Sequence, residues 1–428
     1  MTELVFIIFQ IFLFFFLFSF SPIVLKENII KKYHLSENIF FNLVIHSNFI
    51  LILSFFNINI LKIIIIYIFS LIILLLINLI KNFKEINLIL RNHFLDFFIL
   101  FLISFIIFCD FGNNLFLSWD SEKFWFNKTL NFYNGYSVGD LSDIYKSNYP
   151  YFGGLITSIF WKISFINNEY VNKFIFGFIY ILSLYVLIGN LKISNINKLI
   201  CLFMFLLITY DYSLLFSGNQ EVLVFSIIGY ILHNIYQIKI KKNKDIHINL
   251  IAIFLSLNLL IWTKQEGVFY SIFLIITLFF VFKTDVKKKF MFFSLIILLL
   301  TIRYWIYKLY NLDISINKSI LSSSSPLTYI ERINIDRLVV VLKYFLFSLF
   351  QNYLLIIGII LYCLNKIYKS KIRYLDFYVI INVTFLFTVY LLIDRQEFSI
   401  KYGFDRLVFN ISPFIFLLFI ELVNKKNN

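Results

Sequence analysis

About thirteen long apolar stretches, separated by short polar segments, dominate this chain of 428 residues. A stretch of roughly 17–25 apolar residues is long enough to cross the hydrocarbon core of a bilayer as a helix. The chain is 61% hydrophobic and only 14% charged, whereas soluble domains are about 45–50% apolar and about 25% charged. These features exclude a soluble globular enzyme, a disordered chain and a disulfide-stapled secreted module. They predict an all-α, polytopic membrane protein.

The predicted spans lie near residues 4–25, 38–56, 58–80, 95–109, 170–189, 197–216, 219–238, 247–263, 266–282, 289–310, 337–363, 374–393 and 407–423. The segment 153–166 is apolar but short, so we predict a re-entrant or interfacial piece there. We divide the chain into N-terminal transmembrane helices at residues 1–94 and a transmembrane core at residues 95–428. The core contains a large outer loop, residues 110–169, in which we expect interfacial helices.

The distribution of charge predicts how the spans are oriented. The chain carries 38 Lys and Arg against 24 Asp and Glu, a formal net charge of +14. Most of the basic residues fall in alternate loops, and the positive-inside rule places those loops in the cytoplasm. The N-terminus is then outside and the C-terminus inside. The excess charge is therefore mainly a topology signal, with contacts to anionic membrane lipids as a second effect, and we expect no nucleic-acid partner.

Four polar clusters lie at the outer boundaries of the spans. They are residues 117–128, with Asp120, Glu122 and Lys128; residues 149–154; residues 262–267, with Lys264 and Glu266; and residues 394–407, with Arg406. A further carboxylate, Glu221, lies at the outer start of another span. The outer face is therefore where we expect a functional site.

Two of the carboxylates have both a structural and a functional interpretation. Asp120 is either the cap of an amphipathic helix that runs to about Asn134, or a general base at the mouth of a membrane cavity. Glu221 is either a favourable carboxylate at a helix N-terminus or part of the same site.

The cations and their neighbours are open to the same choice. Lys264 and Glu266 either pair with each other or serve a function, and we favour function because charges this close to hydrocarbon are costly. Arg406 either pairs with Asp405 and anchors at the lipid headgroups, or grips a phosphate with its planar guanidinium.

Several chemistries are absent from the sequence. All five histidines lie outside the outer loops, which excludes a His-rich zinc site there. The chain has no P-loop, no GxSxG and no dinucleotide fingerprint. Asp120, Glu122 and Glu221 are hard oxygen ligands of the kind that a divalent metal accepts, but their spacing does not establish such a site.

Taken in order, the outer clusters resemble the bacterial members of the GT-C membrane glycosyltransferases, a superfamily that includes protein O-mannosyltransferases and lipid A aminoarabinose transferases. The matching pieces are Trp119-Asp120 with Lys128, Tyr149-Pro150, Gly218 through Glu221, Thr263 through Gly267, Asp405-Arg406-Leu407, and Pro413. The resemblance spans about residues 95–425 through short motifs separated by apolar sequence. This chain has Glu221 where such relatives more often have Asp. Three spans also precede the region of resemblance that begins at residue 95, whereas the better-known members start with one.

The resemblance implies a sugar donor of the polyprenyl-phosphate type, inversion at the anomeric carbon, and an active site on the outer face of the bacterial inner membrane. The acceptor would be a glycan, a lipid or a protein. Sugar transfer needs a base for the acceptor hydroxyl and cations for the departing phosphate. The expected site has Asp120 as catalytic base, with Lys128, Lys264, Glu266, Arg406, Glu221 and Glu122 binding substrate and phosphate.

Three other functions compete with this interpretation. A transporter or flippase of lipid-linked sugars would have ionisable residues at mid-membrane and broken helices. Candidate mid-span charges are few here; Lys62, Lys173 and Lys343 are the ones we consider, and Lys173 is close to an outer end. A polymerase or ligase of lipid-linked glycans would be expected to use arginine-rich outer clusters, and residues 110–169 contain no arginine. A purely structural protein would not require charges at so many helix ends on one face.

Overall fold

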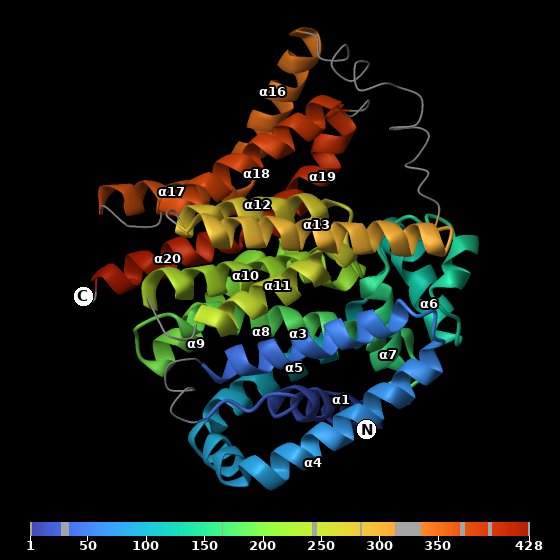
Figure 1. The fold of residues 1–428 in the computed structure, drawn as a ribbon. Helices are drawn as coiled ribbons and strands as arrows, with labels where there is room; N and C mark the ends of the chain where they lie inside the picture. The colour runs from blue at the N-terminus through green and yellow to red at the C-terminus, as the bar shows by residue number, and fades with distance from the viewer. Residues whose placement is uncertain are drawn as a thin grey trace.

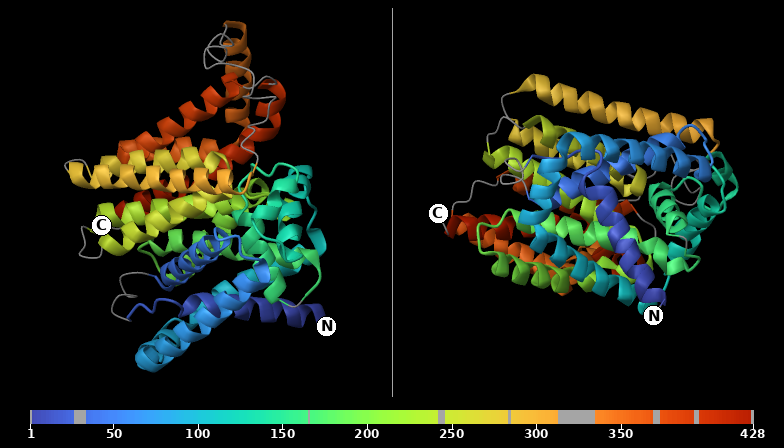
Figure 2. Two further views of the ribbon diagram at one scale, coloured as in Figure 1. Left: turned by 45° about the vertical axis from the view of Figure 1, so that its right-hand side comes forward. Right: turned by 90° about the horizontal axis from the view of Figure 1, so that it is seen from below.

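The structure of the chain is a computed structural model, and it describes residues 2–26, 34–164, 166–241, 246–282, 285–312, 335–368, 373–392 and 396–426. All regular elements within these ranges are helical, as predicted. Figure 1 shows most of the helices lying side by side in one bundle. The short helices α6 (Asn127–Tyr133) and α7 (Phe152–Ile163) lie at one end of it, and the C-terminus lies at the other (Figures 1 and 2).

Nine helices among the described residues are long and apolar enough to cross a membrane, or eleven if each of two bent pairs is one span. The nine are α3 (Leu35–Ser54), α4 (Ile60–Asn92), α5 (Phe94–Asn114), α8 (Phe174–Gly189) with its preceding turn, α9 (Asn195–Ser213) with its following turn, α10 (Glu221–Lys241), α11 (Ile246–Thr263), α13 (Val286–Leu309) and α18 (Arg373–Leu392). These are the helices of a multi-pass membrane protein.

The predicted number of spans, about thirteen, exceeds this number for two identifiable reasons. Two predicted spans coincide with shorter apolar helices, α1 (Thr2–Ser19) and α12 (Glu266–Val281). Two others are bent: α16 (Ile335–Gln351) meets α17 (Tyr353–Ile367) at 79°, and α19 (Gln396–Ile411) meets α20 (Pro413–Lys426) at 43°.

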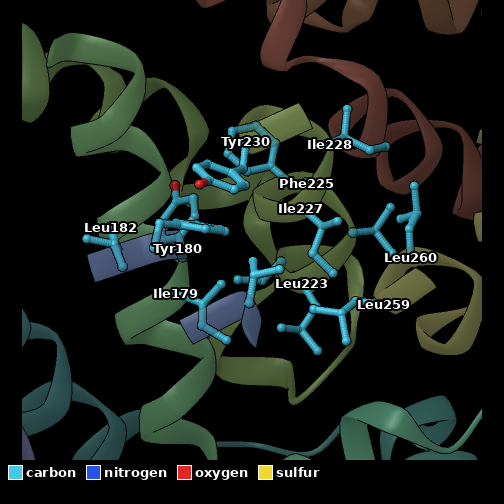
Figure 3. Packing of buried hydrophobic residues seen from close by; sticks show 14 of the residues in the cluster. Ile179, Tyr180, Leu182, Leu223, Phe225, Ile227, Ile228, Tyr230, Leu259 and Leu260 are labelled. Carbon is cyan, nitrogen blue, oxygen red and sulfur yellow. The ribbon is translucent and has the colours of Figure 1, made fainter. Parts of the chain in front are cut away.

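The centre of the bundle is built around α8 and α10, whose apolar windows are completely buried. A helix that is hydrophobic on all sides is stable only when other helices surround it. Figure 3 shows Ile179, Tyr180 and Leu182 of α8 beside side chains of α10 and α11. By contrast, α4 and α13 bury only 28% and 22% of their apolar windows, so most of their surface is left for lipid.

The outer loop forms a helix where the sequence predicts one. Helical residues begin at Trp119, pass through a wide π-helical turn at Ser121–Phe126, and continue into α6. The helix ends at Asn134, and Gly135 follows with a φ of +96°, as the Asn-Gly stop predicts. The predicted cap is wrong, however. The Ser118 hydroxyl accepts a hydrogen bond from the Ser121 N–H, and the side chain of Asp120 makes no capping bond.

The predicted re-entrant segment is α7, and it is buried in protein. Nearly all of its residues are buried, and it packs against α6 and α11. Gly154 allows this close approach, because a Cβ there would lie 3.1 Å from the Cβ of Lys128. Protein thus surrounds a helix of 12 residues, which is too short to cross a bilayer.

The segment predicted as one span near 337–363 is broken at Asn352. The Asn352 side chain caps α17 by accepting from the Leu355 N–H, and its Nδ2 donates to Asp405 Oδ1 at 2.6 Å. The sequence did not predict this break, because the segment is apolar on both sides and a single buried Asn supplies the cap. The break thereby ties α17 to α19.

Candidate functional site

A cleft of about 800 Å³ opens at the end of the bundle where α6 and α7 lie. It is lined by Ser118, Trp119, Asp120, Phe124, Trp125, Tyr149, Leu214, Ser217, Asn219, Glu221, Lys264, Glu266, Tyr390, Ser399, Gly403, Arg406 and Leu407. The outer loop, the starts of α10 and α12, the end of α18 and one face of α19 all contribute. The structure thus brings five of the seven predicted site residues into one cleft: Asp120, Glu221, Lys264, Glu266 and Arg406.

Arg406 joins two carboxylates that are far apart in the sequence. Its Nη1 donates to Asp120 Oδ2 at 2.7 Å, and its Nε and Nη2 donate to Glu221 Oε1 at 2.7 and 2.6 Å. The alternative partner considered from the sequence, Asp405, bonds to Asn352. Arg406 also lies within α19, which begins at Gln396, whereas the predicted span begins only at residue 407.

Glu221 is the buried centre of the charged cluster. Its Oε1 also accepts from Lys264 Nζ at 3.0 Å, while Lys264 Nζ lies 3.9 Å from Glu266 Oε1. Glu221 is 0% exposed, and within the described part of the chain its second oxygen, Oε2, has no hydrogen-bond partner. Burial lowers the pKa of Lys264, but the carboxylates of Glu221 and Glu266 outweigh burial and raise that pKa above its usual value.

The backbone around these charges requires glycine at two positions. A Cβ on Gly267 would lie 2.0 Å from the carbonyl oxygen of Leu260, so only glycine permits the tight turn that places Lys264 at the cleft. Gly218 has a φ of +74°, and a Cβ there would lie 2.5 Å from Leu117. Glu221 begins α10 three residues after Gly218.

A hydrogen-bonded group of small polar side chains holds the start of the outer-loop helix. Ser121 Oγ donates to Asn219 Oδ1 at 2.8 Å, and Ser118 Oγ donates to Ser121 Oγ at 3.0 Å. These bonds connect the residues on both sides of Asp120 to the connection that precedes α10. Asp120 is therefore held by its neighbours and keeps its carboxylate for Arg406.

Lys128 does not reach the cleft, although the sequence predicts it as a phosphate ligand. It is 0% exposed, and its Nζ donates to the carbonyl oxygens of Lys146 and Tyr149, at 2.9 and 2.5 Å. Burial, together with the charge of Arg303, holds its pKa well below the usual value. Lys128 thereby connects the start of α6 to the later part of the outer loop.

Glu122 also lies outside the cleft. Its side chain is 53% exposed and pairs with Lys123 at 2.8 Å. The predicted metal ligands Asp120, Glu122 and Glu221 are therefore not brought together. Among the described residues no group of three or more His, Cys, Asp or Glu side chains is arranged to hold a metal ion.

Three residues that line the cleft, Asn219, Tyr390 and Ser399, had no role assigned from the sequence. Asn219 lies inside the motif Gly218 through Glu221 and Ser399 inside the cluster 394–407, so their places in these segments were the available signal. Tyr390 lies on α18, where no pattern distinguishes it from the other residues of an apolar helix.

No family model, curated protein or solved structure matches this chain.

Proposed function

We propose that this chain is an integral-membrane glycosyltransferase that moves a sugar from a polyprenyl-phosphate carrier to an acceptor hydroxyl. The observation that supports this most is Arg406, held between a buried carboxylate and a partly exposed one in a large cleft at the end of a multi-helix bundle. Neither an anchoring role nor a bond to Asp405 accounts for this arrangement. A guanidinium between two carboxylates is a ready phosphate ligand if one carboxylate can leave.

Asp120 is the carboxylate suited to leave. It contacts Arg406 through one oxygen and its side chain is 33% exposed, whereas Glu221 is fully buried and contacts both cations. If a phosphate takes the place of Asp120 at Nη1 of Arg406, the displaced Asp120 carboxylate stays in a position that water already reaches. Replacing Glu221 would leave a buried charge without its partners, which is far more costly.

The charge of the cleft is nearly balanced before a substrate enters. Three carboxylates, Asp120, Glu221 and Glu266, face two cations, Lys264 and Arg406, which gives a formal sum of −1. The N-termini of α10 and α12 also lie at the cleft, and each contributes about half a positive charge. A phosphate is therefore accepted if it takes over the place of Asp120, and binding of the donor releases the base.

In the proposed reaction, Asp120 takes the proton of the acceptor hydroxyl as the acceptor oxygen bonds to the anomeric carbon. The bond between that carbon and the phosphate oxygen breaks, and its electron pair leaves with the phosphate. Arg406 and Lys264 stabilise the departing charge in a cleft where water is partly excluded. The chain provides the acid–base and electrostatic parts of sugar transfer without a nucleotide site.

The proposal includes thirteen crossings and an active site on the outer face of the inner membrane. The charges support that orientation, because α10 has Glu221 at the cleft and ends at Lys241 at the far side of the bundle. In this proposal each of the two bent pairs is one crossing, and the short apolar helices α1 and α12 are two more beyond the nine long helices.

A transporter of lipid-linked sugars is the second candidate, because two helix pairs are broken, as transporters require. Reconstitution into vesicles with a radiolabelled polyprenyl-phosphate sugar decides between the two. We expect label to move to an acceptor, and Arg406→Ala to prevent it. Movement of the intact labelled lipid between leaflets, with no transfer to any acceptor, would reject the transferase in favour of the transporter.

A further inference from the structure

We propose that the outer-loop side of the cleft is a sugar-binding platform formed by Trp119, Phe124, Trp125 and Tyr149, here called the aromatic wall. The inference rests on the proposed function and adds the class of ligand that this part of the cleft holds: a pyranose ring. All four side chains line the cleft. The aromatic belt of a membrane protein faces the lipid boundary, and these rings face the cavity that holds the charged cluster.

The rings of the aromatic wall are fixed in place before any ligand arrives. Phe124 stacks on Tyr149 with ring centroids 5.1 Å apart, and Trp119 meets the Phe124 ring edge-on at 5.3 Å. Lys128 Nζ lies 5.8 Å and 6.0 Å from the centroids of Trp125 and Tyr149. Its hydrogen bond to the Tyr149 carbonyl oxygen fixes the same segment. The buried lysine is therefore a support for the aromatic wall.

Trp119 is the open face of this wall. Its side chain is 61% exposed although it adjoins Asp120, the base in the proposed function. A large aromatic ring at a cleft offers an apolar surface that a ligand can cover. Because Trp119 precedes Asp120 in the chain, a sugar ring bound on Trp119 would lie close to the carboxylate that accepts the proton of the acceptor hydroxyl.

The other side of the cleft presents hydrogen-bond acceptors. Glu221 Oε2 is buried without a hydrogen-bond partner among the described residues, and Glu266 is partly exposed. A pyranose has one apolar face of C–H groups and a rim of hydroxyl donors. It therefore matches a cleft with aromatic rings on one side and carboxylate oxygens on the other, the pattern of apolar lining with a few polar groups that is typical of ligand sites.

The test uses the full chain, purified in deuterated detergent, with the methyl glycosides of glucose, mannose, galactose and N-acetylglucosamine as probes. Saturation-transfer NMR, with saturation of the aromatic protons, reports which ligand protons lie against the rings. We expect transfer to the ring C–H protons of at least one glycoside. Tetramethylammonium is included because a cation also binds aromatic rings near carboxylates.

Matched variants locate the effect. Trp119→Leu keeps apolar bulk but removes the aromatic face, and should weaken glycoside binding about tenfold, whereas Trp119→Phe should cost less than about threefold. Trp305→Leu is the control, because Trp305 is 57% exposed on α13 and does not line the cleft. In a transfer assay, Trp119→Leu should raise KM with little change in kcat. A rise in the KM of the acceptor assigns the wall to the acceptor sugar, and a rise in the KM of the donor assigns it to the donor sugar.

The platform is wrong if no glycoside receives saturation, if Trp119→Leu binds glycoside as tightly as the wild type, or if only tetramethylammonium is bound. Binding of polyprenyl phosphate, measured on the same samples, separates this failure from that of the proposed function. Lipid-phosphate binding without glycoside binding rejects the wall alone. Absence of lipid-phosphate binding by the wild type rejects the proposed function.

Discussion

Two polar clusters of different character lie along α10, one at its first residue and one in its second half, towards its other end. At one end Glu221 meets Arg406 and Lys264 at a cleft of about 800 Å³. Twelve residues later, about 18 Å along the axis, His233 Nε2 lies 3.1 Å from Glu37 Oε1, and Asn190 Nδ2 lies 2.7 Å from His233 Nδ1. The cavity beside Glu37 has only about 20 Å³.

A polar cluster in an apolar bundle can be structural or functional, and the space beside it distinguishes the two. The cluster around His233 is closed, and it joins α3, α8 and α10 by hydrogen bonds. Asn424 of α20 adds a bond from its Nδ2 to the Asn190 carbonyl oxygen at 2.9 Å. Room remains for about one water molecule. We interpret this end as structural and the Glu221 end as the site, and each of the following experiments tests that division.

The largest effect is expected from Asp120→Asn at the open end. Asn cannot accept the proton, so sugar transfer should fall about 10²–10⁴-fold. The fold should survive, because Ser118 caps the helix and Asp120 does not. The same variant should bind polyprenyl phosphate more tightly than the wild type, because the competitor for Arg406 has lost its charge. Transfer at the wild-type rate would remove Asp120 from the site, and weaker phosphate binding would reject the exchange of partners.

Arg406 and Lys264 should act on one ligand, with a smaller effect. Arg406→Lys keeps the charge but loses the planar fork, so polyprenyl phosphate should bind less tightly, and Arg406→Ala should weaken binding further. A double-mutant cycle with Lys264→Ala should show coupling of about 0.5–3 kcal/mol, since both contact Glu221. Asp405→Ala is the control. If it reduces activity as much as Arg406→Ala while phosphate affinity stays constant, Arg406 is an anchor only.

At the closed end we expect loss of stability without loss of function. His233→Leu removes the partner of the Glu37 carboxylate and one of the partners of Asn190, which should lower the free energy of unfolding by about 1–3 kcal/mol. Thermal unfolding in detergent measures this change. Phosphate affinity of the folded variant should equal that of the wild type, and a tenfold change in it would show that the two ends are coupled.

The smallest effect is expected from alkaline pH. The pKa of Lys264 is raised in the folded protein. The contribution of its charge to stability is therefore complete below the pKa of the unfolded chain, about 10.4. It is lost only as pH rises through the higher pKa of the folded protein. Phosphate affinity that depends on Lys264 should therefore be constant between about pH 7 and about pH 9. Isothermal titration with polyprenyl phosphate, compared with Lys264→Ala, checks this. A steady fall in the wild type alone would contradict it.

Hydrophobic length predicted most of the helices: eleven of the thirteen predicted spans coincide with one helix each, and the other two with bent pairs. The bend at Asn352 was not predictable in the same way, since it depends on a hydrogen bond to Asp405 on a distant helix. The site was predicted in part. The predicted helix ends place Glu221, Lys264 and Glu266 at the same end of the bundle. Which of these charges form ion pairs with one another depends on how the helices pack, which the sequence pattern does not give.

Lys128 shows most clearly what sequence position leaves open. It lies in the same outer cluster as Asp120, and that position, together with the resemblance, favoured a phosphate ligand. The backbone carbonyl oxygens of Lys146 and Tyr149 bind its ammonium instead. Carbonyl groups are present at every position of a chain, so no sequence pattern distinguishes a lysine that binds them from one that binds substrate.

The wide turn at Ser121–Phe126 makes the number of residues in this segment important. A π-helical turn accommodates one residue more than an α-helical turn, and each residue advances an α-helix by about 100°. Deleting one residue there, such as Lys123, would restore regular α-helix and rotate Trp119 and Asp120 by about 100° relative to α6. Whether Asp120 points towards Arg406 thus depends more on the number of residues in this segment than on their identity. Within this stretch, single-residue insertions and deletions should be far less tolerated than substitutions.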